Sequence, residues 1–286
     1  MIPAAPLWQC VDRALDLRAP VVMGVLNVTP DSFSDGGRFG NRDTALAQAR
    51  RMIEEGARII DVGGESTRPG ALAASLEEEL ARVIPVIEAV RRESSVFISV
   101  DTSKPEVMRA AVAAGADIIN DVRALQEPGA IEAAAATRAG VCLMHMKGEP
   151  RTMQDDPSYS DVLAEVRDFL ISRIRAAHEA GIDRERITID PGFGFGKRAR
   201  HNLALLKRLA ELAPLHAPVL VGLSRKSMLA TITGRPVAER VAGSVALAAI
   251  AVLNGARIVR AHDVAPTVDA VRVAAAIEQG DAFDGT

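Results

Sequence analysis

The sequence predicts an α/β protein folded as one (β/α)8 TIM barrel. Eight short runs rich in β-branched residues alternate with eight longer stretches of helical periodicity, which is the order of elements in such a barrel. The runs are apolar on both faces, as expected of parallel strands covered by helices. The 286 residues fit a single barrel of about 250 residues, and no linker or block of charge divides the chain.

The expected elements follow one another in a regular order. The strands are expected at 20–27, 58–62, 96–101, 117–121, 141–146, 187–190, 218–223 and 257–262. The helices are expected near 42–56, 75–93, 105–114, 128–139, 159–180, 202–211, 236–254 and 264–279. Glycines precede five strands at positions where helix C-caps belong, namely Gly56, Gly115, Gly140, Gly181 and Gly255. We expect residues 1–19 to form an N-terminal extension that covers the closed end of the barrel, and residues 20–280 to form the barrel domain.

The composition is that of an ordinary globular protein. Hydrophobic residues make up 48% and charged residues 25% of the chain, which excludes disordered, collagenous and disulfide-stapled proteins. The 34 basic and 37 acidic residues are mixed along the chain, so neither nucleic acid nor a membrane surface is an expected partner. We find neither a signal-peptide pattern nor an apolar stretch long enough to span a membrane. Cys10 and Cys142 form no C-x-x-C pair, so we expect a cytoplasmic location.

The active site of a TIM barrel lies at the C-terminal ends of its strands. The first expected strand ends in Asn27, whose side-chain oxygen could bind a hard cation such as Mg²⁺, which takes few protein oxygens. An ordinary Asx turn is the alternative. The second strand runs into a loop at 63–70 with glycines, hydroxyl groups and one cation, which suits closure over an anion or a plain solvated loop.

Polar side chains also end the third and fourth expected strands. Asp101 and the pair Asn120 and Asp121 suit a polar heterocycle, because carboxylate and amide groups match its donors and acceptors. Helix capping alone explains the neighbouring Thr102 or Ser103.

Two further strand ends carry weaker signals. His145 ends the fifth strand, where a histidine is more often a satisfied barrel residue than a base. The sixth strand runs into DPGFGFGK (190–197), whose glycines let the backbone approach a ligand closely, with a flexible loop as the alternative. Four of the nine aromatic residues fall in or beside the loops after the first and sixth strands, at the expected mouth of the site: Phe33, Phe39, Phe193 and Phe195.

The strongest signal comes from the last two strands. Arg225 and Lys226 open a helix at its positive end, where the helix dipole disfavours cations. Arg260 and His262 lie two residues apart on the last strand, so their side chains share one face. Phosphate sites in TIM barrels commonly form after these two strands. The pattern predicts a phosphate-like anion, with salt bridges to the strand-end carboxylates as the alternative.

Seven segments together resemble the dihydropteroate synthase family. They are MGVLNVTPDSFSDGG (23–37), DVGGESTRPGA (61–71), VDTSKPEV (100–107), INDV (119–122), DPGFGFGK (190–197), GLSRKSML (222–229) and RAHDV (260–264). The resemblance spans nearly every strand end and implies a TIM barrel, in agreement with the strand count. It implies a transferase of folate biosynthesis that joins 6-hydroxymethyl-7,8-dihydropterin diphosphate to 4-aminobenzoate, giving 7,8-dihydropteroate and diphosphate. It also implies a homodimer and a sulfonamide target.

The resemblance further implies a role for individual residues. Asn27 would bind Mg²⁺ on the diphosphate, and Arg260 and His262 would hold the diphosphate oxygens. The dihydropterin would be contacted by Asp101, Asn120, Asp190 and Lys226, with Met144 and Gly222 lining its slot. Ser227, Phe195 and Pro69 would border the aminobenzoate. Thr67 and Arg68 would come from a mobile loop that closes over the reacting groups, together with the loop that carries Asp31, Phe33 and Ser34. The residues implied in catalysis are Asp101, Lys226, Arg260, His262, Thr67 and Arg68.

Two positions depart from the family pattern. Lys147 stands where Gln is expected, and Ala261 where Val is expected. The alternatives are a pterin-binding methyltransferase that passes a methyl group from methyltetrahydrofolate to a corrinoid, and a non-catalytic pterin-binding protein. The former has no diphosphate to bind, so the cations at Arg225, Lys226 and Arg260 argue against it. The intact anion site and loop motifs argue against the latter.

Overall fold

Eight parallel strands form a closed barrel in the computed structural model, which describes residues 7–29, 38–65, 73–149 and 152–280. The strands are β3 (Val21–Asn27), β4 (Ile59–Gly63), β5 (Phe97–Asp101), β6 (Ile118–Asp121), β7 (Gly140–Met144), β8 (Ile187–Asp190), β9 (Val219–Gly222) and β10 (Ala256–Ala261). Each strand pairs with the next in the chain, and β10 closes the ring on β3. The predicted TIM barrel is confirmed.

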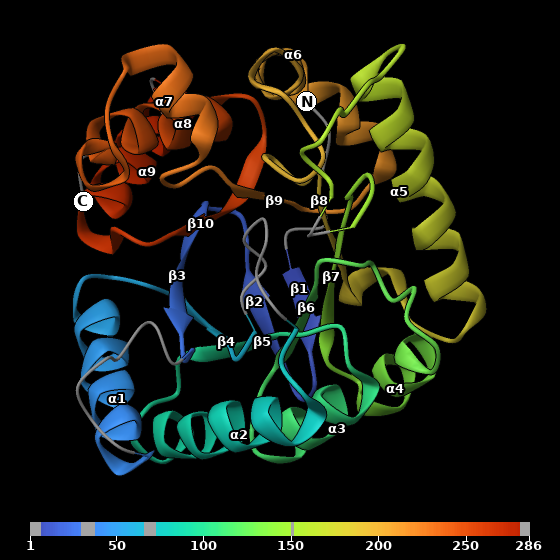
Figure 1. Ribbon diagram of the computed structural model, residues 1–286, viewed down its shortest axis with the longest axis vertical. Helices are drawn as coiled ribbons and strands as arrows, with labels where there is room; N and C mark the ends of the chain where they lie inside the picture. The colour runs from blue at the N-terminus through green and yellow to red at the C-terminus, as the bar shows by residue number, and fades with distance from the viewer. Residues whose placement is uncertain (1–6, 30–37, 66–72, 150–151, 281–286) are drawn as a thin grey trace.

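Helices surround the strands on the outside of the barrel (Figure 1). They are α1 (Arg38–Glu54), α2 (Leu76–Glu93), α3 (Pro105–Ala113), α4 (Ala130–Thr137), α5 (Val162–Glu179), α6 (Ala199–Lys207), α7 (Ser227–Thr233), α8 (Val241–Leu253) and α9 (Val264–Gln279). Short 3-10 segments lie at Arg184–Arg186, Leu209–Leu215 and Val237–Glu239. None of the helices in the described parts of the chain is long and apolar enough to cross a membrane.

Local sequence explains where the helices begin and end. Helix α2 begins with a capping box, because the Glu78 amide donates to the Ser75 hydroxyl and the Ser75 amide donates to the Glu78 carboxylate. Helix α7 begins at Ser227, directly after Arg225 and Lys226, where the sequence predicts the start of a helix, and the helix expected at 236–254 begins later, at Val241. Gly234, in a left-handed conformation, ends α7, and Pro236 follows it.

The N-terminal hairpin packs under one end of the barrel. Strands β1 (Leu7–Cys10) and β2 (Arg13–Asp16) are antiparallel. Trp8 is fully buried, and its indole donates a hydrogen bond to the Arg186 carbonyl at 2.8 Å. It belongs to an apolar cluster with residues at or near the beginnings of barrel strands, including Ile59, Phe97 and Ile118. The hairpin therefore lies at the end of the barrel opposite the C-terminal ends of the strands.

One of the expected helix caps is wrong. Gly56, Gly115, Gly181 and Gly255 have positive φ angles, but Arg138 rather than Gly140 takes the left-handed conformation after α4. Gly140 is needed for space, because a Cβ atom there would lie 2.7 Å from the Cys10 sulfur and 2.9 Å from the Trp8 indole nitrogen. The glycine therefore lets the hairpin dock against β7.

Candidate active site

Four charged or polar groups converge inside the C-terminal end of the barrel. Asp61 from β4, Asp101 from β5 and Asn120 from β6 are buried, and Arg260 reaches them from β10 across the barrel. The Arg260 guanidinium donates from Nε to Asp61 Oδ2 at 2.6 Å and from Nη2 to Asp101 Oδ2 at 2.7 Å. The Asn120 amide donates to the same Asp61 oxygen at 3.2 Å. The register places Asp101 opposite Asn120 on β6 and opposite Gly63 on β4, so Asp61 lies two residues before Gly63, deeper in the barrel.

This cluster of charges perturbs its own proton affinities. Burial raises the pKa of Asp101 to about 7 despite the nearby Arg260 charge. Burial also raises the pKa of Asp190 to about 6, although the carboxylate accepts the Gly192 amide at 2.7 Å. Burial and the Arg260 charge lower the pKa of Lys226 to about 8. Several strongly perturbed groups in one place are typical of a functional site.

Lys226 and Phe195 lie together at the mouth of the barrel. The Lys226 ammonium is 4.3 Å from the centre of the Phe195 ring. Gly194 leaves room for the lysine stem, since a Cβ atom there would be 3.0 Å from Lys226 Cδ. No described atom lies within 4 Å of the position that a Cβ would take at Gly222, at the end of β9. Met144 is buried at the end of β7.

The residues predicted to bind an anion after the last two strands have different partners in the structure. Arg225 forms a bidentate ion pair with Asp263, at 2.9 and 2.5 Å, so for this residue the salt-bridge alternative applies. His262 shares a hydrogen bond of 3.1 Å between Nδ1 and the Ser224 hydroxyl. Burial and the Arg260 charge lower the pKa of His262 to about 4, so its ring is neutral near pH 7. The salt-bridge alternative applies to Arg260 as well, because it pairs with Asp61 and with Asp101 at the end of β5, and these charges outweigh burial and raise its pKa.

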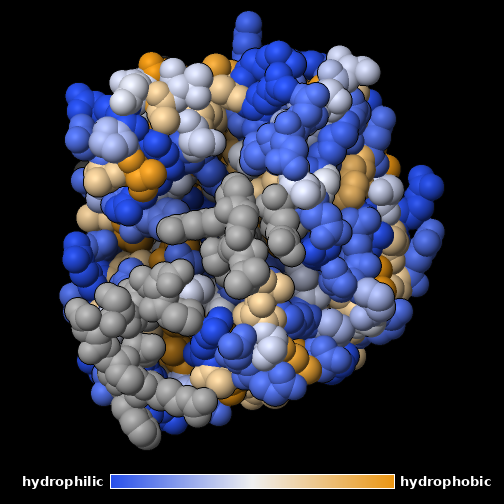
Figure 2. All heavy atoms as spheres, viewed as in Figure 1, coloured by the Kyte–Doolittle hydropathy of each residue, from blue (hydrophilic) through white to orange (hydrophobic). Residues whose placement is uncertain are grey.

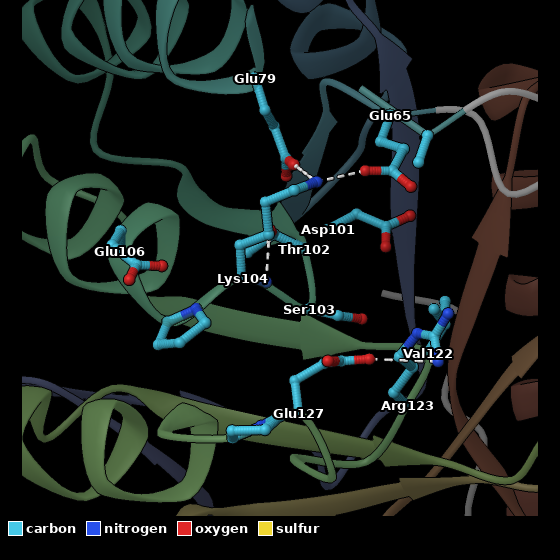
Figure 3. Close-up of a pocket in the computed structure, with 13 residues that line it drawn as sticks. Glu65, Glu79, Asp101, Thr102, Ser103, Lys104, Glu106, Val122, Arg123 and Glu127 are labelled. Carbon is cyan, nitrogen blue, oxygen red and sulfur yellow. Dashed lines mark hydrogen bonds and ion pairs between the residues drawn. The ribbon is translucent and has the colours of Figure 1, made fainter. Parts of the chain in front are cut away.

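A polar cavity of about 350 Å³ adjoins Asp101 on the side of α3 (Figure 3). In Figure 3 Lys104 lies between Glu65 and Glu79, and it pairs with both carboxylates. Asp121 does not serve this cavity as a free acceptor, because it accepts the Ser103 hydroxyl and the amides of Arg123 and Leu125. The Thr102 hydroxyl accepts the Lys104 amide, so local bonds occupy these side chains.

Some expected residues lie elsewhere. Phe193 is in the hydrophobic core, with 1% of its surface exposed, so its expected place at the mouth is wrong. Each glycine of the loop has a positive φ, which breaks the strand-like alternation that would have placed the Phe193 ring on the same face as the Phe195 ring.

His145 is a buried barrel residue with a neutral ring, because burial and the Lys197 charge lower its pKa to about 3. The residues Asp31, Phe33, Ser34, Thr67, Arg68 and Pro69, and the side chain of Phe39, lie outside the described part of the chain.

Comparison with known proteins decides the family. Residues 23–262 match the family described as pterin binding enzyme. The chain is 57% identical over 260 residues to the dihydropteroate synthase of Escherichia coli strain K12, covering 91% of this chain and 92% of that protein. The chain belongs to the dihydropteroate synthase family. Solved structures agree: the Yersinia pestis synthase in complex with a sulfonamide drug is 50% identical, with a TM-score of 0.92 over 96% of this chain and all of that one. The Xanthomonas albilineans synthase with 4-aminobenzoic acid is 54% identical, with a TM-score of 0.91 over 96% and 99% of the two chains.

Membership of the dihydropteroate synthase family confirms the resemblance, the activity and the class of enzyme predicted from the sequence. The matches cover at least nine tenths of both chains, which favours a synthase over the methyltransferase alternative. The two departures from the family pattern lie away from the buried cluster. Lys147 binds Glu165 at 2.8 Å and the Ser158 carbonyl at 2.6 Å, and Ala261 lies in the aliphatic core.

Two residues of this dihydropteroate synthase were missed by the sequence reasoning about the site. Asp61 joins Arg260 to Asn120, and the available signal was a carboxylate inside an otherwise apolar strand. Lys197 is buried beneath the loop that carries Phe195. The available signal for Lys197 was its place as the last residue of the glycine-rich segment 190–197.

Proposed function

We propose that the protein joins the methylene carbon of 6-hydroxymethyl-7,8-dihydropterin diphosphate to the amino nitrogen of 4-aminobenzoate. A C–N bond forms, the C–O bond to diphosphate breaks, and the amine loses a proton. The observation that carries the proposal is the convergence of Asp101, Asn120 and Arg260 at the open end of a barrel of this family. The related Xanthomonas albilineans synthase has been solved with 4-aminobenzoic acid and with 7,8-dihydropteroate.

The dihydropterin is assigned to the buried polar end of the pocket. Asp101 and Asp190 offer carboxylate acceptors, and Asn120 offers both a donor and an acceptor. Such a set matches the amino and ring nitrogens of a pterin, and Met144 and Gly222 would border the flat ring. We assign Lys226 to the same ring because it follows β9 beside Asp190 and acts on that carboxylate's pKa.

The diphosphate is assigned to Arg260 and His262 on the last strand. Asp61 and Asp101 occupy Nε and Nη2 of the Arg260 guanidinium, so its remaining N–H groups are the ones available to a phosphate oxygen. The neutral His262 ring can donate one N–H while its other nitrogen stays with Ser224. These donors would stabilise the charge that grows on the leaving oxygen.

The residues at the end of β3 fit Mg²⁺. Asn27 Oδ1 and Asp101 Oδ2 each lie 3.8 Å from the point where a Gly63 Cβ would stand, so the Asn27 amide oxygen faces the same part of the barrel mouth as the Asp101 carboxylate. Mg²⁺ prefers oxygen ligands and takes only one or two from protein when it also binds phosphate. When bound there by Asn27, the ion would offset diphosphate charge. Activity should require Mg²⁺, and Asn27→Ala should raise the Mg²⁺ concentration needed for half activity.

The chemistry needs a good leaving group more than a base. An arylamine is already a neutral nucleophile, so no side chain has to remove a proton before attack. The electron-rich dihydropterin, held by Asp101 and Asp190, can delocalise the positive charge that develops on the methylene carbon. Water would compete with the arylamine for that carbon. We therefore assign to the loop residues Thr67 and Arg68 the exclusion of water, which makes the reaction specific for the amine.

A coupled assay tests the function. Purified protein with Mg²⁺ should release diphosphate and form dihydropteroate only when both substrates are present. Absence of product from folded protein would refute the proposal. Sulfonamides, which mimic 4-aminobenzoate, should compete with it at the subsite assigned to Phe195 and Ser227, and a noncompetitive pattern would refute that subsite.

We also assign a homodimer and a cytoplasmic location. Four apolar side chains on the adjacent helices α8 and α9 are 45% to 62% exposed: Ile250, Leu253, Val273 and Ile277. Figure 2 shows apolar residues among polar ones over this part of the surface. Exposed apolar side chains of this size suit a subunit interface. Val273→Glu with Ile277→Glu should give a monomer in light scattering, whereas a monomeric unaltered protein would refute the dimer. Both cysteines are free and buried, in keeping with a reducing cytoplasm.

A further inference from the structure

Lys197 is a buried lysine that the proposed reaction does not use. It follows the glycine-rich loop after β8, and 2% of its surface is exposed. Among the residues that the structure describes, no carboxylate forms an ion pair with it. Lysines are almost never fully buried without a charged partner, because the ammonium loses its hydration. We therefore expect Lys197 to have a role that offsets the cost of burying its ammonium group.

The Lys197 ammonium ties two strand-end loops together. Its nitrogen lies 2.9 Å from His145 Nδ1, 2.9 Å from the Gly192 carbonyl oxygen and 3.1 Å from the Phe195 carbonyl oxygen. Burial lowers the pKa of Lys197 to about 7. In its ammonium form the group has three N–H donors, which these three acceptors satisfy. The acceptors come from the end of β7 and from both ends of the loop that begins after Asp190.

The loop held by Lys197 has little room to shift. A Cβ atom at Gly192 would lie 1.8 Å from the His145 carbonyl oxygen, and one at Gly196 would lie 2.2 Å from the Lys147 carbonyl oxygen. The loop backbone therefore rests directly on the neighbouring loop. The Tyr159 hydroxyl donates to the Gly196 carbonyl at 2.8 Å and fixes the loop from its outer side.

The held segment carries the groups that contact Lys226. The Phe195 ring is 4.3 Å from the Lys226 ammonium, and Gly194 lies against the Lys226 stem. A backbone shift at Phe195 would therefore move both the ring and the lysine beside it. The Lys197 bond to the Phe195 carbonyl acts at this residue itself.

We propose that Lys197 is a positioning residue for the arylamine subsite. Its ammonium fixes the backbone of Phe195, and so fixes the ring that borders 4-aminobenzoate and covers Lys226. This inference rests on the proposed function, and it concerns how the subsite is built rather than whether the reaction occurs. It assigns Lys197 no contact with either substrate.

Lys197→Met tests the inference, because it keeps the apolar stem and removes the three donors. The KM for 4-aminobenzoate should rise by about tenfold, corresponding to about 1.4 kcal/mol, while the Kd for dihydropterin diphosphate should stay within about twofold. Arg186→Met is the matched control, since it removes a buried cation that donates to the backbone carbonyls of Ala134 and Ala139 ahead of β8, at the other end of the barrel. The control should leave both constants unchanged. Equal losses for both substrates in folded Lys197→Met would overturn the inference.

A double-mutant cycle separates positioning from general loosening. If Lys197 acts through Phe195, Lys197→Met should raise the KM by less than about twofold in a Phe195→Ala background. Additive effects would overturn the inference. If Lys197→Met does not fold, Tyr159→Phe replaces it as a milder release of the same loop, with a higher KM for 4-aminobenzoate expected and an unchanged KM overturning the inference. An inactive unaltered enzyme refutes the proposed function, whereas an active one with an unaltered KM in Lys197→Met refutes only this inference.

Discussion

The Arg260 guanidinium lies 2.6 Å from Asp61, a carboxylate with no exposed surface. Because Asp61 is sealed inside the barrel, it acts on ligands only through the groups that it holds. It binds Arg260 and Asn120 with one oxygen, and its other oxygen has no partner in the described structure. Asp61 is therefore a positioning residue beneath the assigned pterin and diphosphate sites.

Asp61→Asn should weaken binding of dihydropterin diphosphate by about tenfold or more, equivalent to at least about 1.4 kcal/mol. The amide keeps the shape of the carboxylate but no longer balances the buried Arg260 charge. Calorimetry measures the Kd directly. Asp117→Asn is the control, because Asp117 is a buried carboxylate paired with Arg13 and Arg91 away from the assigned site. It should lower the melting temperature without changing the Kd, and the same pattern for Asp61→Asn would contradict the assigned role.

Binding of the pterin should weaken as the pH falls. The pKa values of Asp101 and Asp190, about 7 and about 6, mean that both carboxyls gain protons between pH 7 and 5. A pterin that donates hydrogen bonds favours the ionised forms, so its binding should release protons in this range. Titrations in buffers of different ionisation enthalpy measure that release. Asp101→Asn should show less release, and an equal release would show that Asp101 is not the group that titrates.

The same raised pKa values predict that the unliganded protein loses stability as the pH rises. The ordinary pKa of an aspartate side chain is 3.8, so at Asp101 and Asp190 the folded state binds more protons than the unfolded state from about pH 4 to 7. The free energy of unfolding should therefore receive a contribution from these groups that is present at low pH and lost through this window. When the free energy of unfolding, measured with urea, is plotted against pH, Asp101→Asn should show a shallower slope than the unaltered protein. Parallel slopes would contradict the prediction.

Gly192→Ala should be severely destabilising, by about 3 kcal/mol or more. The residue has a φ of +69°, and an added Cβ would lie 1.8 Å from the His145 carbonyl oxygen. Gly181→Ala is the matched control, because Gly181 has a φ of +91° with no described atom within 4 Å of the Cβ position. The control should cost about 1 kcal/mol from backbone conformation alone. Urea unfolding of the two variants measures the difference, and equal losses would show that the contact with His145 is easily relieved.

The barrel was predictable because its signals are local. Alternating strand and helix patterns set the element order, and strand ends placed Asp101, Asn120 and Arg260 on one rim. Salt bridges to strand-end carboxylates were predicted only as an alternative to an anion site. The pairing of Arg260 with Asp61 was not predictable, since the two residues are 199 positions apart and their contact exists only once the barrel closes. The different environments of Phe193 and Phe195 were not predictable either, because the positive φ of Gly194 between them breaks the strand-like alternation that would place both rings on one face.

Arg260→Ala should weaken diphosphate binding more than pterin binding. The side chain is assigned to the leaving group, but it also neutralises Asp61 and Asp101, so its loss removes a counter-ion from the pterin site. The pterin effect should therefore be largest near pH 7, where a further rise in the Asp101 pKa protonates that group, and smaller at alkaline pH. Calorimetry with pterin and with diphosphate at pH 7 and pH 9 separates the two contributions. Arg260→Lys keeps the charge and should retain more diphosphate affinity than Arg260→Ala. Equal losses of pterin and diphosphate affinity at pH 9 would contradict this division of roles.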